Sequence, residues 1–75
     1  MSKHSRLAHA VDTVEAALEP GWEWLLRKDP EHGYFANITN PLDATRKVKY
    51  HPAYDEDAAT ALTLSLTAFL NGVEK

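Results

Sequence analysis

Four histidines are the side chains of this chain best suited to acid–base chemistry or to binding a soft metal ion: His4, His9, His32 and His51. Two ligands on one helical face need a spacing of three or four residues, whereas His4 and His9 are five residues apart. His51 and Asp55 together would suit general-base work, but neither a nucleophile nor an oxyanion hole accompanies them. We therefore predict a non-enzymatic protein with no catalytic residue, no metal site and no cofactor.

A second set of residues suits binding rather than catalysis. It combines three cations, an imidazole and an aromatic ring: Lys47, Lys49, His51, Arg27 and Tyr34. Lysines beside an aromatic ring fit an acidic protein surface or a nucleic-acid backbone. The alternative is that charged strand residues only keep an exposed sheet soluble and prevent edge pairing.

Composition narrows the class of protein further. A chain of 75 residues forms one domain, near the lower end of what folds alone. The absence of cysteine excludes a disulfide scaffold, a zinc ribbon and a thiol nucleophile. A net charge of −3 argues against general nucleic-acid binding, which requires a basic surplus. Because no apolar run resembles a signal peptide or spans a bilayer, we expect a cytoplasmic protein without a membrane segment.

The stretch from Asp55 to Gly72 is the longest apolar run, and two periods compete in it. Leucines alternate with threonine and serine as in a strand, but a stripe also recurs at the helical spacings of three and four. Acidic residues before the run suit a helix N-terminus, and Asn71-Gly72 suits a helix end. The sequence therefore predicts a helix over about residues 56–71, with this stripe on one face: Ala58, Ala61, Leu62, Leu66, Phe69, Leu70 and Val73.

A second amphipathic helix is predicted near the N-terminus, over about residues 6–19. Its apolar stripe consists of Leu7, Val11, Val14 and Leu18. Acidic residues occupy the other side, and Pro20-Gly21 ends the helix. Such a stripe fits a helix that lies on the core of its own domain.

Three segments predict strands, over about residues 22–27, 34–38 and 45–51. The first segment is also compatible with a short helix. The turn Asp29-Pro30-Glu31-His32-Gly33 separates the first two segments, and Pro52 ends the third.

The predicted order is therefore α-β-β-β-α in a single α+β domain over residues 1–75. Three antiparallel strands form a sheet, and two helices pack on one of its faces, which leaves the other face in water. By alternation, Lys47, Lys49 and His51 point to the open face, together with Arg27 and either Tyr34 or Phe35. Val48 and Tyr50 point the other way.

This order, with His32-Gly33-Tyr34-Phe35 in the middle and an alanine-rich last helix, resembles the topology of a double-stranded RNA-binding domain over about residues 5–72. That family grips phosphates with a Lys-Lys-x-Ala-Lys cluster at the start of its last helix. This chain has Asp55-Glu56-Asp57-Ala58-Ala59 there, so the charge is reversed. The resemblance implies the topology and does not extend to RNA binding.

Residues 33–71 carry a second resemblance. A short sheet, an acidic loop and the run Ala-Thr-Ala-Leu-Thr-Leu-Ser-Leu-Thr-Ala-Phe-Leu are similar to the C-terminal end of small phage-encoded α-β-α sandwich proteins. The resemblance implies an accessory protein of a phage or prophage that binds and blocks a host protein or defence complex, including CRISPR machinery. It carries no catalytic motif and assigns no site residue.

The main hypothesis is a small binding or inhibitory protein, anti-CRISPR-like, that acts in the host cytoplasm on a protein complex with an acidic surface. Lys47, Lys49 and His51 would form the binding surface, supported by Arg27 and Tyr34. One alternative is a self-associating structural module that forms a homodimer by burying Leu64, or the N-terminal apolar stripe, against a second copy. The other is a nucleic-acid-binding module with the topology of a double-stranded RNA-binding domain.

Overall fold

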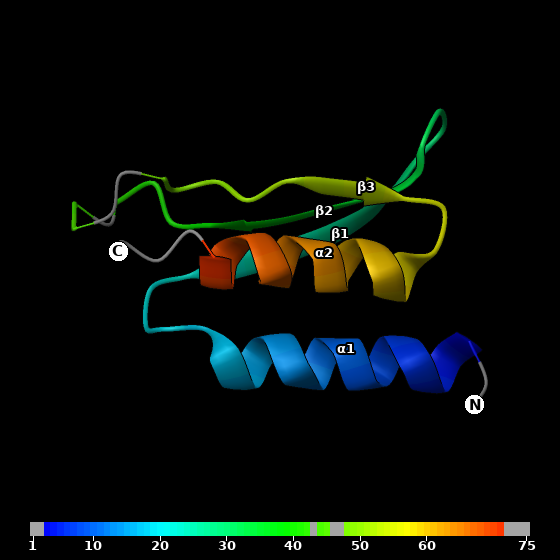
Figure 1. The fold of residues 1–75 in the computed structure, drawn as a ribbon, viewed down its shortest axis with the longest axis horizontal. Coiled ribbons are helices and arrows are strands. Elements are labelled where there is room, and N and C mark those ends of the chain that lie inside the picture. The colour runs from blue at the N-terminus through cyan, green and yellow to red at the C-terminus, as the bar shows by residue number, and fades with distance from the viewer. Residues whose placement is uncertain (1–2, 43, 46–47, 72–75) are drawn as a thin grey trace.

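A computed structural model of the chain describes residues 3–42, 44–45 and 48–71 and confirms the predicted α+β class. The elements follow in the order α1 (Lys3–Ala17), β1 (Glu23–Asp29), β2 (Gly33–Thr39), β3 (Ala53–Asp55) and α2 (Ala58–Asn71). The strands form one antiparallel sheet in the order β1-β2-β3. Figure 1 shows α2 against the sheet and α1 alongside α2, with both helices running in the same direction. Among the described residues, no helix is both long and apolar enough to cross a membrane.

The apolar stripe of α1 holds this helix to the domain. Val14 is fully buried, and Leu7, Val11 and Leu18 are partly buried against the core. The backbone N–H of Leu18 donates to the carbonyl of Val14 at 3.1 Å, so helical bonding continues one residue past the end of α1. This stripe is therefore part of the protein's own core, as the N-terminal pattern predicts.

The core lies between the two helices and one face of the sheet. Three rings meet there: Trp22 and Phe69 have centroids 4.9 Å apart, and His51 lies 5.6 Å from Phe69. The hydroxyl of the fully buried Ser65 donates to the backbone carbonyl of His51, which ties α2 to the segment before β3. The buried apolar side chains are Ala10, Val14, Trp22, Ala36, Ile38, Ala58, Ala59, Ala61, Leu62, Leu66 and Phe69.

The third strand is not where the sequence predicts it. Of the described residues in 45–51, Tyr50 alone pairs with β2, in a single bridge to Thr39, and β3 begins at Ala53. The bridge continues the register that pairs Ala53 with Ala36. Pro52 interrupts this ladder because it has no N–H to donate, yet β3 is an edge strand, where proline is tolerated. The prediction was wrong because it took Pro52 as the end of the strand.

Asp57, the residue before α2, caps this helix and connects it to α1. One carboxylate oxygen, Oδ2, accepts the backbone N–H and the hydroxyl of Thr60, both at 2.9 Å. The guanidinium of Arg6 lies 3.0 Å from the same oxygen. Asp57 therefore caps the helix as expected for an aspartate at this position, and it pairs with a cation of α1 as well.

We expect the capping contribution of Asp57 to be lost in acid. The bonds from Thr60, and then the charge of Arg6, hold the pKa of Asp57 below its ordinary 3.8. A lowered pKa means that the contribution is fully present above pH 3.8 and disappears as the pH falls through the folded-state value. Asp57→Ala should therefore lower the free energy of unfolding at pH 7, measured in urea, and lower it less at acid pH.

Asp57→Asn is the matched control, because asparagine also caps a helix but carries no charge. It should lose less stability than Asp57→Ala at pH 7, and the cap that it keeps should not titrate. Equal stability of wild type and Asp57→Ala at pH 7 would contradict this role.

Candidate binding surface on the open sheet face

The face of the sheet away from the helices is the candidate functional site. Along β1, Trp24 and Leu26 turn toward the helices and are partly buried, so by alternation Arg27 turns to the other face. The strand register pairs Arg27 with Phe35, and Phe35 with Tyr54. One residue from each strand therefore lies in a row across the open face. We call Arg27, Phe35 and Tyr54 the sheet-face row.

The side chains of the sheet-face row lie close together. The guanidinium carbon of Arg27 is 5.1 Å from the centroid of the Phe35 ring. The rings of Phe35 and Tyr54 have centroids 5.0 Å apart and are tilted by 47°. These distances suit a cation–π contact and a tilted aromatic pair. Tyr54 is nevertheless 51% exposed, and Leu25, two residues from Arg27 on β1, is 40% exposed. The row is thus an ordered surface that still faces solvent.

The turn between β1 and β2 places an imidazole beside this row. The ring centroid of His32 is 4.9 Å from that of Tyr54. The Oδ1 atom of Asp29 accepts the backbone N–H groups of Glu31 and His32, at 2.8 and 3.1 Å, and lies 3.4 Å from Nδ1 of His32. These bonds, that from Glu31 first, lower the pKa of Asp29 below its ordinary 3.8. Asp29 is therefore ionised at neutral pH and holds the turn that positions His32.

The charge of Arg27 is available to a partner. Within the described part of the chain, no carboxylate lies within ion-pair distance of this guanidinium; the pairs found there join Arg6 to Asp57 and His32 to Asp29. The Phe35 ring fixes Arg27 from one side without neutralising it. The face therefore offers one oriented cation next to two aromatic rings.

The structure does not bring the five predicted binding residues together on one face. Arg27 lies on the open face, as alternation predicts. Tyr34 does not, because it is partly buried against the core, and its neighbour Phe35, the other alternative, takes the open face. Lys49 is partly buried, and Lys47 lies outside the described residues.

The expectation that His51 is exposed was wrong, since only 4% of it is exposed. Its ring lies 5.8 Å from that of Trp22 and 5.6 Å from that of Phe69, within the core. Val48 and Tyr50, which alternation placed on the opposite side from His51, are exposed instead. The prediction placed the charged or titratable side chains in solvent. In the structure, the imidazole of His51 packs against aromatic rings, and the neighbouring apolar residues are exposed.

Tyr54 and His32 were missed as members of this surface. Tyr54 alternates with Ala53 and Asp55 after Pro52, which is a three-residue strand signal too short to stand out. Its pairing with Phe35 across the sheet depends on the strand register, which the sequence does not give. His32 was recognised as a turn residue, and its place beside Tyr54 follows from the pairing of β2 with β3.

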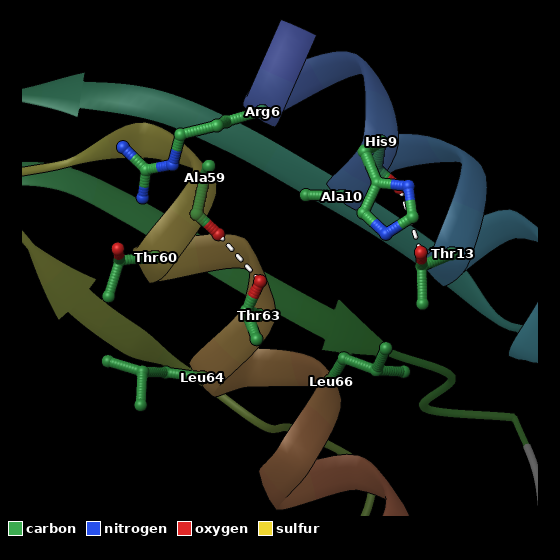
Figure 2. Close-up of a pocket in the computed structure, with 9 residues that line it drawn as sticks. All are labelled: Arg6, His9, Ala10, Thr13, Ala59, Thr60, Thr63, Leu64 and Leu66. Carbon is green, nitrogen blue, oxygen red and sulfur yellow. Dashed lines mark hydrogen bonds between the residues drawn. The ribbon is translucent and has the colours of Figure 1, made fainter. Parts of the chain in front are cut away.

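A second concave feature lies between the two helices, on the side away from the sheet. Figure 2 shows this groove, which has a volume of about 400 Å³. Its lining is mostly apolar or hydroxyl-bearing and includes Ala10 and Thr13 of α1 and Thr63, Leu64 and Leu66 of α2. Arg6 and His9 of α1 also line it, and it has no phenylalanine, tyrosine or tryptophan, so its chemistry differs from that of the sheet-face row.

Neither surface has the residues of a metal centre. Among the described residues, no three histidine, aspartate or glutamate side chains gather in a way that would hold a metal ion. Asp29 and His32 are joined in the turn that carries His32, and Asp57 is engaged by Thr60 and Arg6. Comparisons with protein-family models, with curated proteins and with solved structures find no match to this chain.

Proposed function

We propose that this chain is a non-enzymatic protein-binding module and that the open sheet face is its binding surface. The observation that carries the proposal is the sheet-face row, in which Arg27, Phe35 and Tyr54 contact one another across three strands while Arg27 and Tyr54 are exposed and Phe35 is half-buried. Arginine and aromatic residues are the side chains most enriched at the energetic centres of protein interfaces. The strands hold them in place, so little conformational freedom is lost on binding.

The chemistry of the row indicates the chemistry of its partner. Arg27 requires a carboxylate, since a buried guanidinium must be paired. Phe35, Tyr54 and Leu25 require an apolar or aromatic surface beside that carboxylate. The partner is therefore a protein that presents an acidic residue next to an apolar patch, consistent with the acidic partner predicted from the sequence. Lys49 and Lys47 would lie outside the centre of this contact.

The resemblance to phage accessory proteins extends this proposal. Under it, the partner is a component of a host defence complex in a bacterial cytoplasm, and the module inhibits that complex by occupying its acidic site. The small size of the chain and the position of the row on a solvent-facing sheet are compatible with such a blocking role. Affinity capture identifies the partner and so decides this extension separately from binding itself.

The test is affinity capture from a bacterial lysate, followed by purification of the captured protein and measurement of its dissociation constant. The variant Arg27→Glu with Tyr54→Ala removes the cation and one ring of the row. Loss of a residue at the centre of an interface typically costs about 2 kcal/mol or more, so binding should weaken at least ~30-fold. Far-UV circular dichroism checks that the variant is folded.

The matched control is Lys28→Glu with Leu42→Ala. Lys28 follows Arg27 on β1 and turns to the other face, and Leu42 is an exposed leucine of the loop after β2. The control makes the same change in net charge and also removes one exposed apolar side chain. It should bind like the wild type. Equal binding by wild type and the Arg27 variant would reject the sheet face, and salt-sensitive binding to single-stranded oligonucleotides through the row would indicate a nucleic-acid partner instead.

A further inference from the structure

The outer face of α2 is unusual for a helix at a protein surface. No residue from Ala58 to Asn71 is charged, although Thr63, Leu64, Thr67 and Leu70 are exposed. Surface helices of soluble proteins normally carry charged residues on the side that faces water, and a helix without them is normally covered. One side of α2 is covered by the sheet. The opposite side requires a second explanation.

The hydroxyl groups of Thr63 and Thr67 on this side donate to backbone carbonyls of α2 itself. Thr63 donates to the carbonyl of Ala59 at 2.8 Å, and Thr67 donates to that of Thr63 at 2.9 Å. Across the groove, Thr13 of α1 donates to the carbonyl of His9 at 2.8 Å. Each of these hydroxyl protons is used within its own helix. Covering the face therefore leaves none of these donors unsatisfied, which is the main cost of burying a polar group.

The same face carries both a hollow and a projection. The hollow is the groove between α1 and α2, about 400 Å³ in volume and lined by small or hydroxyl-bearing side chains such as Ala10, Thr13, Ala59 and Thr63. The projection is Leu64, 45% exposed, which also lines the groove and extends from α2 on the side away from α1 in Figure 2. A two-fold symmetric contact needs one patch that is complementary to itself, and a hollow next to a projection meets this condition.

We propose that two copies of this chain associate through this face, with Leu64 of each copy entering the groove of the other. The absence of charge favours a second copy as the occupant. Two molecules of net charge −3 repel each other, and a contact between two α2 helices, which carry no charged residue, brings no pair of like charges on α2 together. The cation that borders the groove, Arg6, is already paired with Asp57, so the face offers little to a charged partner.

The size of the face sets the expected strength. A helix of 14 residues is about 21 Å long, and two neighbouring helices present a face about 20 Å wide. The contact then buries roughly 400 Å² on each copy, which is at the weak end for a specific interface. We expect a reversible dimer with a dissociation constant on the order of 0.1 mM. Both sheet-face rows would point outward in it, so the dimer would be bivalent.

Analytical ultracentrifugation from about 10 µM to about 1 mM, a range that brackets this constant, tests the proposal. The wild-type mass should rise from 8.4 kDa toward twice that value. Leu64→Lys places a charge where the second copy must bury it, so this variant should stay monomeric. Lysine is a good helix former, which favours a folded variant, and Thr67→Lys is a second variant with the same expectation. Circular dichroism verifies folding.

Leu25→Lys is the matched control, because it changes a leucine of similar exposure, 40% against 45%, to the same cation on the opposite face of the molecule. It should dimerise like the wild type. A wild type that stays monomeric to the top of the range would overturn the proposal. So would dimerisation of folded Leu64→Lys, or loss of dimerisation in Leu25→Lys alone, which would place the contact on the sheet face.

Discussion

Replacement of Phe69 by alanine should lower the free energy of unfolding by about 3–5 kcal/mol, the cost typical of removing a large buried aromatic side chain. Phe69 is 2% exposed, and its ring lies 4.9 Å from that of Trp22 and 5.6 Å from that of His51. A domain of 75 residues has a total stability of roughly 4–11 kcal/mol. The variant therefore loses a large share of this stability, because alanine leaves a cavity at the point where α2 meets the rings of the core.

Urea unfolding followed by tryptophan fluorescence measures this effect, since Trp22 reports directly on the site. Leu70→Ala is the control, as it removes a similar apolar side chain from the next position of α2, where the residue is exposed. A substitution at such a surface position should change the free energy of unfolding by about 0.5 kcal/mol or less. Similar losses in both variants would show that helix α2 as a whole, rather than its buried face, limits stability.

Most of the positions that helical periodicity marked as apolar form the core, but Leu70, which the predicted stripe of the last helix included, is 51% exposed, and Val73 lies outside the described residues. Val14 in α1, and Leu62, Leu66 and Phe69 in α2, recur at spacings of three and four and are buried together. The helical pattern can be recognised in the sequence because an apolar residue recurs at each turn of the helix. The helix cap could be predicted for a different reason. An aspartate directly before an apolar run caps the helix through residues close to it in sequence, as the bond from Thr60 to Asp57 shows.

The open sheet face was harder to predict because it depends on pairing between distant segments. A shift of one residue in a strand exchanges its two faces, and the sequence alone does not fix that choice. For the segment before Pro52, assigning the polar residues to water placed His51 outside, whereas the structure buries it and exposes Tyr50. Arg27 and Phe35 were on the correct face, yet their contact with Tyr54 required a strand that begins only after the proline.

The two faces of the molecule also differ in what they contribute to function. The sheet-face row has a cation without an ion-pair partner among the described residues and one exposed ring, that of Tyr54, which suits a partner of complementary charge. The outer face of α2 has no charge and no free hydroxyl proton on Thr63 or Thr67, which suits another copy of the same face. Because the sheet separates them from each other, substitutions on one face should leave the other unaffected. The two binding experiments therefore test independent properties.

Gly33→Ala should destabilise the domain by about 2–4 kcal/mol, through a strained backbone and a steric conflict together. Gly33 has a φ of +92°, a region that residues with a side chain rarely adopt. A Cβ there would lie 2.5 Å from the Cα of Glu56 and 2.8 Å from the carbonyl oxygen of Asp55. Both contacts are to backbone, so the end of the β1–β2 hairpin and the segment leading into α2 must separate to make room.

Gly21→Ala is a matched control for Gly33→Ala, because Gly21 has almost the same φ, +90°, in the turn before β1. A Cβ at Gly21 would meet only the side-chain amide of Asn40, at 3.0 Å, and that side chain can move. Gly21→Ala should therefore cost about 1 kcal/mol, from backbone strain alone. Thermal and urea unfolding of both variants measure the difference. Gly33 is also the first residue of β2 and directly follows His32. Gly33→Ala should therefore displace His32 from Tyr54 and weaken binding at the sheet-face row, whereas Gly21→Ala should not. Equal destabilisation by the two variants would show that the close approach at Gly33 relaxes without cost and that only its backbone conformation matters.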